Sequence, residues 1–233
     1  MVDHIDQNII DIREKIRSAA KRSGRDPSEI KLMGVTKTHP VEYILSAAPK
    51  LDIIGENRVQ EASEKRSKCR SEISTPWHLI GHLQRNKARK ALEIFDLIET
   101  VDSLDIARML DRILAETDSS GFPVYLEINM SGELTKSGVA PQEAASLLER
   151  VMQYCPRLSV EGLMTIGPNT EEEREIRGAF EGLRLLRDGL ASGSGLPLRE
   201  LSMGMSGDYE IAVEEGSTIV RVGTGIFGKR SAN

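Results

Sequence analysis

The stretch STIVRVGTGIFG, residues 217–228, is predicted to be the eighth short apolar strand of the chain, and that number decides the fold. β-branched and aliphatic residues fill its first half, and glycines follow them. A segment with helical periodicity separates each earlier strand from the next. Eight strands alternating with helices are typical of an α/β fold closed into a single (β/α)8 barrel, a TIM barrel. The alternative is an open doubly wound sheet.

The seven earlier strands share an apolar body that ends in polar residues or glycine. They are KLMGVTK (31–37), LDIIGEN (51–57), WHLIGHL (77–83), FDLIETVDS (95–103), FPVYLEINM (122–130), LSVEGLMTIG (158–167) and RELSMGMS (199–206). Helices are predicted over 41–48, 57–70, 85–95, 103–117, 141–155 and 171–191, with a short one ending near 215. SGSG (192–195) is a predicted tight linker, and an extra amphipathic helix over about 3–22 precedes the first strand. We therefore predict a single domain over residues 1–233.

The composition excludes several function classes. With 233 residues, 39% of them hydrophobic, the chain is long enough for one sizeable core. A net charge of -5 argues against nucleic acid or a membrane as a partner, and no apolar run approaches the roughly 20 residues of a membrane span. Two cysteines without metal spacing indicate a reduced, cytoplasmic protein with no metal. His39 and His78 are predicted to be structural, the first in a turn and the second in a strand.

The ends of the last two strands predict a phosphate site. In a (β/α)8 barrel, functional groups gather at the C-terminal ends of the strands, and the loops after strands seven and eight commonly bind phosphate. MSGDYE offers Ser206 and Gly207 at a helix start, where free N–H groups attract an anion. VGTG offers Gly223, which permits close backbone approach, and the hydroxyl of Thr224. Together these residues predict a phosphate cradle.

Lys37 ends the first strand and should face the same cavity. A desolvated lysine has a lowered pKa and becomes a nucleophile towards aldehydes. An amine at one end and an anion site at the other suit pyridoxal 5'-phosphate. Arg221 precedes Gly223 by two residues, so both point inward on an extended strand, while Val220 and Val222 face the helices. Because arginine keeps its proton, Arg221 would leave the cofactor's pyridine nitrogen unprotonated.

Eight motifs in the same order resemble a known family. They are VTKTHP, GENRVQE, WHLIGHLQRNK, TVDSLDIA, INMSGELTKSG, GLMTIGP, LSMGMSGDYEIAVEEGST and VRVGTGIFG, which run from residue 35 to 228. The chain is similar to the YggS/PROSC family of pyridoxal phosphate homeostasis proteins, whose barrel is related to the N-terminal domain of alanine racemase. The resemblance implies a barrel of that type, fold type III among pyridoxal phosphate proteins.

The resemblance also implies roles for individual residues. Lys37 would form the internal aldimine, and Asn57 would line the pocket. Ser206, Gly207, Gly223 and Thr224 would hold the phosphate, with Arg221 facing the pyridine nitrogen. His82 and Met164 sit at strand ends that border the pocket, and we expect them to contact the cofactor. Lys136, in SGELTKSG, would reach the mouth and take part in passing the cofactor on.

Two functions compete on this evidence. A carrier would hold the cofactor for cellular homeostasis and deliver it transiently to apo-enzymes, without a reaction of its own. A racemase needs acid and base groups on both faces of its substrate, and related enzymes take the second, a tyrosine, from a C-terminal domain. We expect no such domain after Asn233, and only Tyr209 lies near the predicted site. We therefore expect a monomeric carrier; an aldolase using Lys37, with Glu56 or Asp208 as base, is a third alternative.

Overall fold

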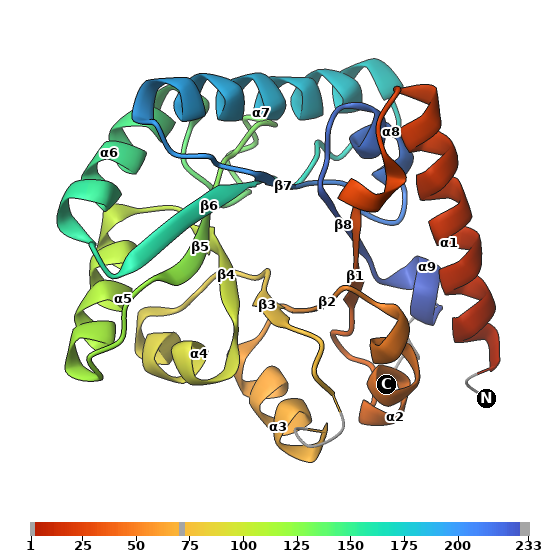
Figure 1. Cartoon of the computed structure of the whole chain (residues 1–233), viewed down its shortest axis with the longest axis horizontal. Helices are drawn as coiled ribbons and strands as arrows, with labels where there is room; N and C mark the ends of the chain where they lie inside the picture. The colour runs from red at the N-terminus through yellow and green to blue at the C-terminus, as the bar shows by residue number, and fades with distance from the viewer. Residues whose placement is uncertain (1–2, 70–72, 229–233) are drawn as a thin grey trace.

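Eight parallel strands close into a barrel in which each strand pairs with its neighbours in chain order and β8 pairs with β1 (Figure 1). The structure, a computed structural model, describes residues 3–69 and 73–228. The strands are β1 (Lys31–Val35), β2 (Ile53–Glu56), β3 (Trp77–Leu79), β4 (Leu97–Val101), β5 (Phe122–Glu127), β6 (Leu158–Met164), β7 (Glu200–Ser202) and β8 (Ile219–Val222). The predicted (β/α)8 barrel is confirmed, and the open doubly wound sheet is wrong.

Helices surround the barrel on the outside (Figure 1). They are α1 (Asp3–Arg22), α2 (Val41–Ala47), α3 (Val59–Cys69), α4 (Ala88–Ile94), α5 (Leu104–Glu116), α6 (Ala144–Tyr154), α7 (Glu173–Ser194), α8 (Tyr209–Glu214) and α9 (Thr224–Phe227). Single 3₁₀ turns occur at Pro27–Glu29, Ala48–Lys50, Arg85–Lys87 and Pro141–Glu143. The helix predicted over 57–70 runs to Cys69, and residue 70 lies outside the described residues.

Two predicted boundaries are wrong for local reasons. The strand predicted over 217–228 ends at Val222, because Gly223 turns the backbone and Thr224 starts the short helix α9. The linker predicted at 192–195 is mostly helical, since α7 continues to Ser194. Only Gly195 leaves the helix, in the left-handed conformation (φ 73°) that commonly terminates one. The remaining strands are shorter than predicted because their polar ends lie in the loops at the barrel mouth.

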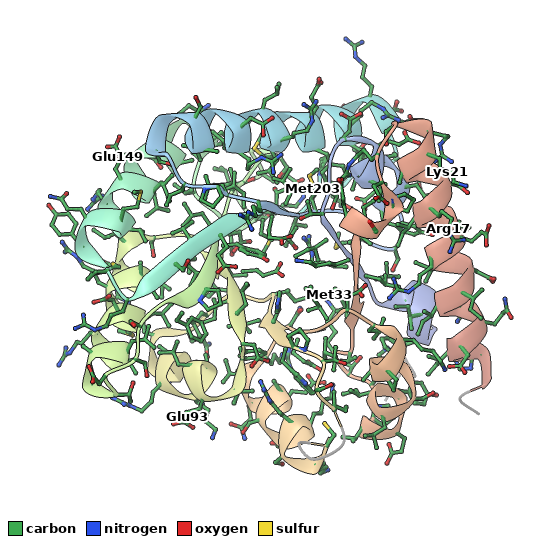
Figure 2. The ribbon with its side chains drawn as sticks, viewed as in Figure 1. Arg17, Lys21, Met33, Glu93, Glu149 and Met203 are labelled. Atoms are coloured by element: carbon green, nitrogen blue, oxygen red, sulfur yellow. The ribbon has the colours of Figure 1, made fainter. Side chains whose placement is uncertain are left out.

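The N-terminal helix α1 covers the seam where β1 meets β8 (Figure 1). Isoleucines at helical spacing form its buried face, and these are Ile5, Ile9, Ile12 and Ile16. They belong to the same apolar cluster as Val220 and Val222, which therefore face outward from β8 as predicted. Figure 2 shows Arg17 and Lys21 pointing away from the barrel on the opposite face of α1. Burial of the isoleucine stripe thus holds α1 against the closing strands.

The barrel interior combines an apolar layer with buried polar groups. Its apolar cluster is formed by Met33, Val35, Ile53, Leu97, Tyr125, Met164 and Ile219. Figure 2 shows Met33 near the centre of the barrel. Arg221, which pairs in register with Met33 across the seam, is only 3% exposed and is therefore an interior charge. The barrel interior is therefore a packed core and not a pore, as is typical of this fold.

The docking of α1 predicts a large difference between two adjacent isoleucines. Ile9 is 2% exposed and Ile10 is 56% exposed. Replacing Ile9 by alanine should lower the free energy of unfolding by about 2–4 kcal/mol, because it removes buried atoms and leaves a cavity. The matched Ile10→Ala change should alter it by less than about 0.5 kcal/mol. Urea unfolding followed by circular dichroism measures both, and equal effects would contradict this packing.

Candidate functional site

A pocket of about 330 Å³ lies at the C-terminal mouth of the barrel, where parallel strands deliver their loop residues. Its lining comprises Val35, Lys37, His39, Asn57, Ile80, Ile166, Met205, Ser206, Gly207, Arg221, Gly223, Thr224 and Gly228. Among these are seven of the nine residues predicted to contact a cofactor: Lys37, Asn57, Ser206, Gly207, Arg221, Gly223 and Thr224. The structure therefore brings together an amine, a guanidinium and two polar loops.

His82 and Met164 do not line this pocket. Met164 is fully buried in the apolar interior, and Ile166 lines the pocket in its place. The side chain of His82 is 59% exposed, with its Nδ1 3.8 Å from Oδ2 of Asp102, whereas Ile80 lines the pocket. Met164 thus lies two positions before the pocket residue Ile166, and His82 lies two positions after the pocket residue Ile80.

The loops after β7 and β8 are joined beside Lys37. The backbone N–H of Gly225 donates to Oγ of Ser206 at 3.3 Å, which ties one loop to the other. Within the described part of the chain, no acceptor is found for the backbone N–H groups of Ser206 and Gly207. A Cβ at Gly223 would lie 3.3 Å from the carbonyl oxygen of Val35, so glycine keeps the two strand ends close. Free amide donors facing a pocket suit an anion.

A series of buried hydrogen bonds fixes the side chain of Arg221. Its guanidinium donates to Oγ of Ser202 at 2.9 Å and to the carbonyl oxygen of Thr165 at 2.8 Å. The Ser202 hydroxyl donates to Oε2 of Glu99 at 2.5 Å, and Oε1 of Glu99 lies 2.7 Å from Nδ1 of His78. Burial lowers the pKa of Arg221, while the carboxylates of Glu99, Asp208 and Glu127 oppose that shift. The guanidinium therefore keeps its charge and a fixed direction at the pocket floor.

Glu127 is a buried carboxyl whose surroundings shift its pKa towards neutral pH. It ends β5, is 3% exposed, and its Oε2 has no hydrogen-bond partner among the described residues. Burial raises the pKa of Glu127 to about 7, with a further rise from Asp102 and an opposing effect of Arg221. Glu127 is therefore partly protonated at neutral pH.

Sequence reasoning missed several pocket residues, most clearly His39. It was predicted to be a turn residue, yet it lines the pocket and its ring stacks on Tyr43 with centroids 5.7 Å apart. Phe227 of α9 lies 5.1 Å from the same ring. The feature of the sequence that could have identified His39 as a pocket residue was its position two residues after Lys37 in the same loop. Ile80 and Ile166 also line the pocket, but no motif in the sequence marked these apolar residues as part of a site.

Lys136 occupies a neighbouring part of the mouth. Its Nζ donates to Oε1 of Glu133 at 2.6 Å and to the carbonyl oxygen of Gly167 at 2.7 Å. These contacts join the β5 loop to the β6 loop, and Lys136 is not part of the pocket lining. Among residues 3–69 and 73–228, no group of three or more His, Cys, Asp or Glu side chains could hold a metal ion. No helix in that part of the chain is long and apolar enough to cross a membrane.

Comparisons with known proteins agree with this architecture. The family profile described as the alanine racemase N-terminal domain matches residues 7–231. The pyridoxal phosphate homeostasis protein of Pseudomonas aeruginosa is 41% identical over 230 residues, covering 97% of this chain and 96% of the relative. The human protein of the same name is 37% identical, covering 94% of this chain and 84% of its own length.

Solved structures give the same result. PipY of Synechococcus elongatus with PLP bound has a TM-score of 0.80 and 37% identity, covering 93% of this chain and all of that one. Alanine racemase of Clostridium difficile in complex with cycloserine has a TM-score of 0.78 at 17% identity, a likeness that shows the fold alone. This chain spans 61% of that racemase's length.

Glu127 predicts a pH dependence of stability with a definite sign. Because the pKa of Glu127 is about 7 in the folded state against an ordinary 4.5, the folded protein binds the extra proton between those values. That stabilisation is complete below the ordinary pKa and is lost as pH rises through 7. At about 1.4 kcal/mol per pH unit, the native protein should lose about 2–3 kcal/mol between pH 5 and pH 8.

A matched pair of variants isolates this effect in urea titrations. Glu127→Gln imitates the protonated carboxyl and should abolish most of the loss. Glu161→Gln, at an exposed position of β6, should leave it unchanged. A Glu127→Gln variant that loses as much stability as the native protein would show that another group carries the pH dependence.

Proposed function

The chain belongs to the pyridoxal phosphate homeostasis protein family, within the alanine racemase N-terminal domain family, and on that premise we propose that it binds pyridoxal 5'-phosphate and acts in homeostasis and delivery of this cofactor. The resemblance predicted from the sequence is thereby confirmed. The observation that carries the proposal is that Lys37, Ser206 and Thr224 line the same pocket. The loops of Ser206 and Thr224 are joined there by the hydrogen bond from the Gly225 N–H to Oγ of Ser206.

The residues present fit this cofactor at both of its ends. Pyridoxal phosphate supplies an aldehyde that a lysine amine can hold covalently, and a phosphate dianion. We assign the covalent attachment to Lys37. The amides of Ser206 and Gly207, which have no acceptor among the described residues, would bind the phosphate together with the backbone of Gly223 and the hydroxyl of Thr224. Asn57 and Ile166 would then border the ring.

Arg221 sets what the bound cofactor can do. Ser202 and the carbonyl of Thr165 hold its guanidinium at the pocket floor, where we place the pyridine nitrogen. A guanidinium donates hydrogen bonds and does not give up its proton, so the ring nitrogen would stay unprotonated. An unprotonated ring withdraws electrons weakly, which suits a protein that stores the cofactor more than one that drives carbanion chemistry.

A racemase is the second candidate, and the placement of the tyrosines disfavours it. Racemisation needs an acid and a base on opposite faces of the substrate. None of the four tyrosines, all of them within the described residues, lines the pocket. Tyr209, the one nearest in sequence, packs in the apolar cluster beneath α1, and burial raises its pKa to about 12. We therefore propose a carrier without a dedicated reaction.

The aldolase alternative is disfavoured by the placement of its two candidate bases. One oxygen of Glu56 accepts hydrogen bonds from Lys65 and Thr36, and Oδ1 of Asp208 accepts from the backbone N–H of Met205. Neither carboxyl belongs to the pocket lining. As part of the proposal, the protein is a cytoplasmic monomer that meets apo-enzymes transiently, with Cys69 and Cys155 kept as buried thiols.

Cofactor binding predicts a visible absorption band that depends on one amine. Purified protein mixed with pyridoxal phosphate should absorb visible light as the lysine adduct of this aldehyde does, because the chromophore belongs to the cofactor. Lys37→Ala should abolish that band, whereas Lys90→Ala, at an exposed position of α4 outside the pocket lining, should retain it. A Lys37→Ala protein with an unchanged band would refute the assignment.

Delivery predicts a difference between transfer and release. Protein loaded with pyridoxal phosphate should activate an apo-transaminase faster than the cofactor dissociates into buffer containing a trapping agent. Alanine racemase turnover should be undetectable in the same preparation. Equal rates of activation and release would count against delivery, and racemase turnover that disappears in Lys37→Ala would establish the enzyme instead.

A further inference from the structure

The loop that carries Lys37 is held on both sides by charged residues outside the pocket. We refer to Glu56, Glu61 and Lys65 together as the lysine clamp. Glu56 ends β2, whereas Glu61 and Lys65 lie one turn apart on α3. Their side chains are 0%, 25% and 9% exposed, respectively, so the clamp is largely removed from water.

Lys65 is the centre of the clamp. Its Nζ lies 2.7 Å from Oε1 of Glu56 and 2.6 Å from Oε1 of Glu61. The third contact of Nζ, at 2.7 Å, is the carbonyl oxygen of Thr36, the residue immediately before Lys37. The Thr36 hydroxyl also donates to Oε1 of Glu56 at 2.6 Å. The backbone before Lys37 is therefore fixed to both β2 and α3.

Thr38 fixes the backbone on the other side of Lys37. Its φ of 66° lies in the left-handed region, which a β-branched residue adopts only when its surroundings hold it there. The Thr38 N–H donates to Oε1 of Glu61 at 2.6 Å, the same oxygen that accepts from Lys65. Backbone strain of this kind is concentrated at functional sites.

The pKa shifts of Glu56 and Glu61 follow from their burial and from these contacts. Burial raises the pKa of Glu56, and the nearby ammonium of Lys65 opposes the rise. Burial also acts to raise the pKa of Glu61, but hydrogen bonds from Lys65 and from the Thr38 N–H outweigh it and leave that pKa lowered. Glu61 is therefore an anionic acceptor, and an ionised acceptor binds a backbone N–H more strongly than a neutral one.

We propose that Lys65 and Glu61 are positioning residues for Lys37, which they serve by fixing Thr36 and Thr38 and so the direction in which the Lys37 amine enters the pocket. This inference rests on the proposed attachment of pyridoxal phosphate to Lys37. The loops proposed to bind phosphate follow β7 and β8, and within the described part of the chain no hydrogen bond or ion pair joins Ser206, Gly207, Gly223 or Thr224 to the clamp. Loss of the clamp should therefore slow bond formation by the amine without weakening the initial binding of the cofactor.

Stopped-flow absorbance with increasing pyridoxal phosphate separates the two steps. The half-saturating concentration reports initial binding, and the limiting first-order rate reports formation of the bond to Lys37. Glu61→Ala removes the acceptor of the Thr38 N–H and should lower the limiting rate by about 10- to 100-fold, the effect of displacing a reacting group by about 1 Å. The half-saturating concentration should change by less than about twofold, because the phosphate contacts are intact.

Two variants make the comparison specific. Glu61→Gln keeps an oxygen at the same position for the Thr38 N–H and should restore most of the rate. Glu64→Ala removes an exposed carboxylate from the same helix, whose contact is with the Gln60 amide, and should behave as the native protein does. If Glu61→Ala does not fold, Glu61→Asp replaces it, since it withdraws the carboxylate by one methylene and should also slow the reaction.

The outcomes distinguish this inference from the proposed function. If the native protein forms a bond that Lys37→Ala abolishes, yet Glu61→Ala or Glu61→Asp reacts at the native limiting rate, the positioning role is wrong and the cofactor assignment stands. A rise in half-saturating concentration with an unchanged limiting rate would also overturn it. If the native protein forms no bond with Lys37, the proposed function fails first.

Discussion

The pairing of β8 with β1 is the contact on which the site depends. In this pairing Met33 lies opposite Arg221 and Gly34 opposite Val222, although the paired strands are at opposite ends of the chain. The register places the loop after β1 next to the loop after β8, so Lys37 and Gly223 line one pocket. A shift by one residue would turn Arg221 towards the helices. The stripe of isoleucines on α1 covers the seam and protects this register from solvent.

The buried charged groups in the barrel interior lower the stability of the fold but place charge at the floor of the pocket. An apolar residue at position 221 would fill the core without a desolvation cost, whereas a buried guanidinium requires acceptors and compensating carboxylates. Ser202 of β7, Glu99 of β4 and the carbonyl of Thr165, which directly follows β6, provide these groups. Glu127 adds a buried carboxyl, one oxygen of which has no hydrogen-bond partner in the part of the chain that the structure describes. Departures from an apolar core of this kind are expected where a fold serves a ligand.

The strands and most of the pocket could be predicted from the sequence because both follow local rules. Strand alternation identified the inward face of β8, and glycines beside serine or threonine marked the two loops that line the pocket after β7 and β8. Depth along the barrel axis is not encoded in alternation, which is why Met164 and His82 were assigned to the pocket. The lysine clamp could not be predicted from the sequence for a different reason. Glu61 is 23 residues from Thr38, and only the packing of α3 against the β1 loop brings them together.

The central claim is that Lys37 holds pyridoxal phosphate covalently, and borohydride trapping tests it most directly. Reduction of the loaded protein, followed by proteolysis and mass spectrometry, identifies the modified lysine. The account predicts one pyridoxyl group per chain on the peptide that contains Lys37, and none when excess inorganic phosphate blocks the loops of Ser206 and Thr224. Modification mainly at Lys136 or scattered over surface lysines would contradict it.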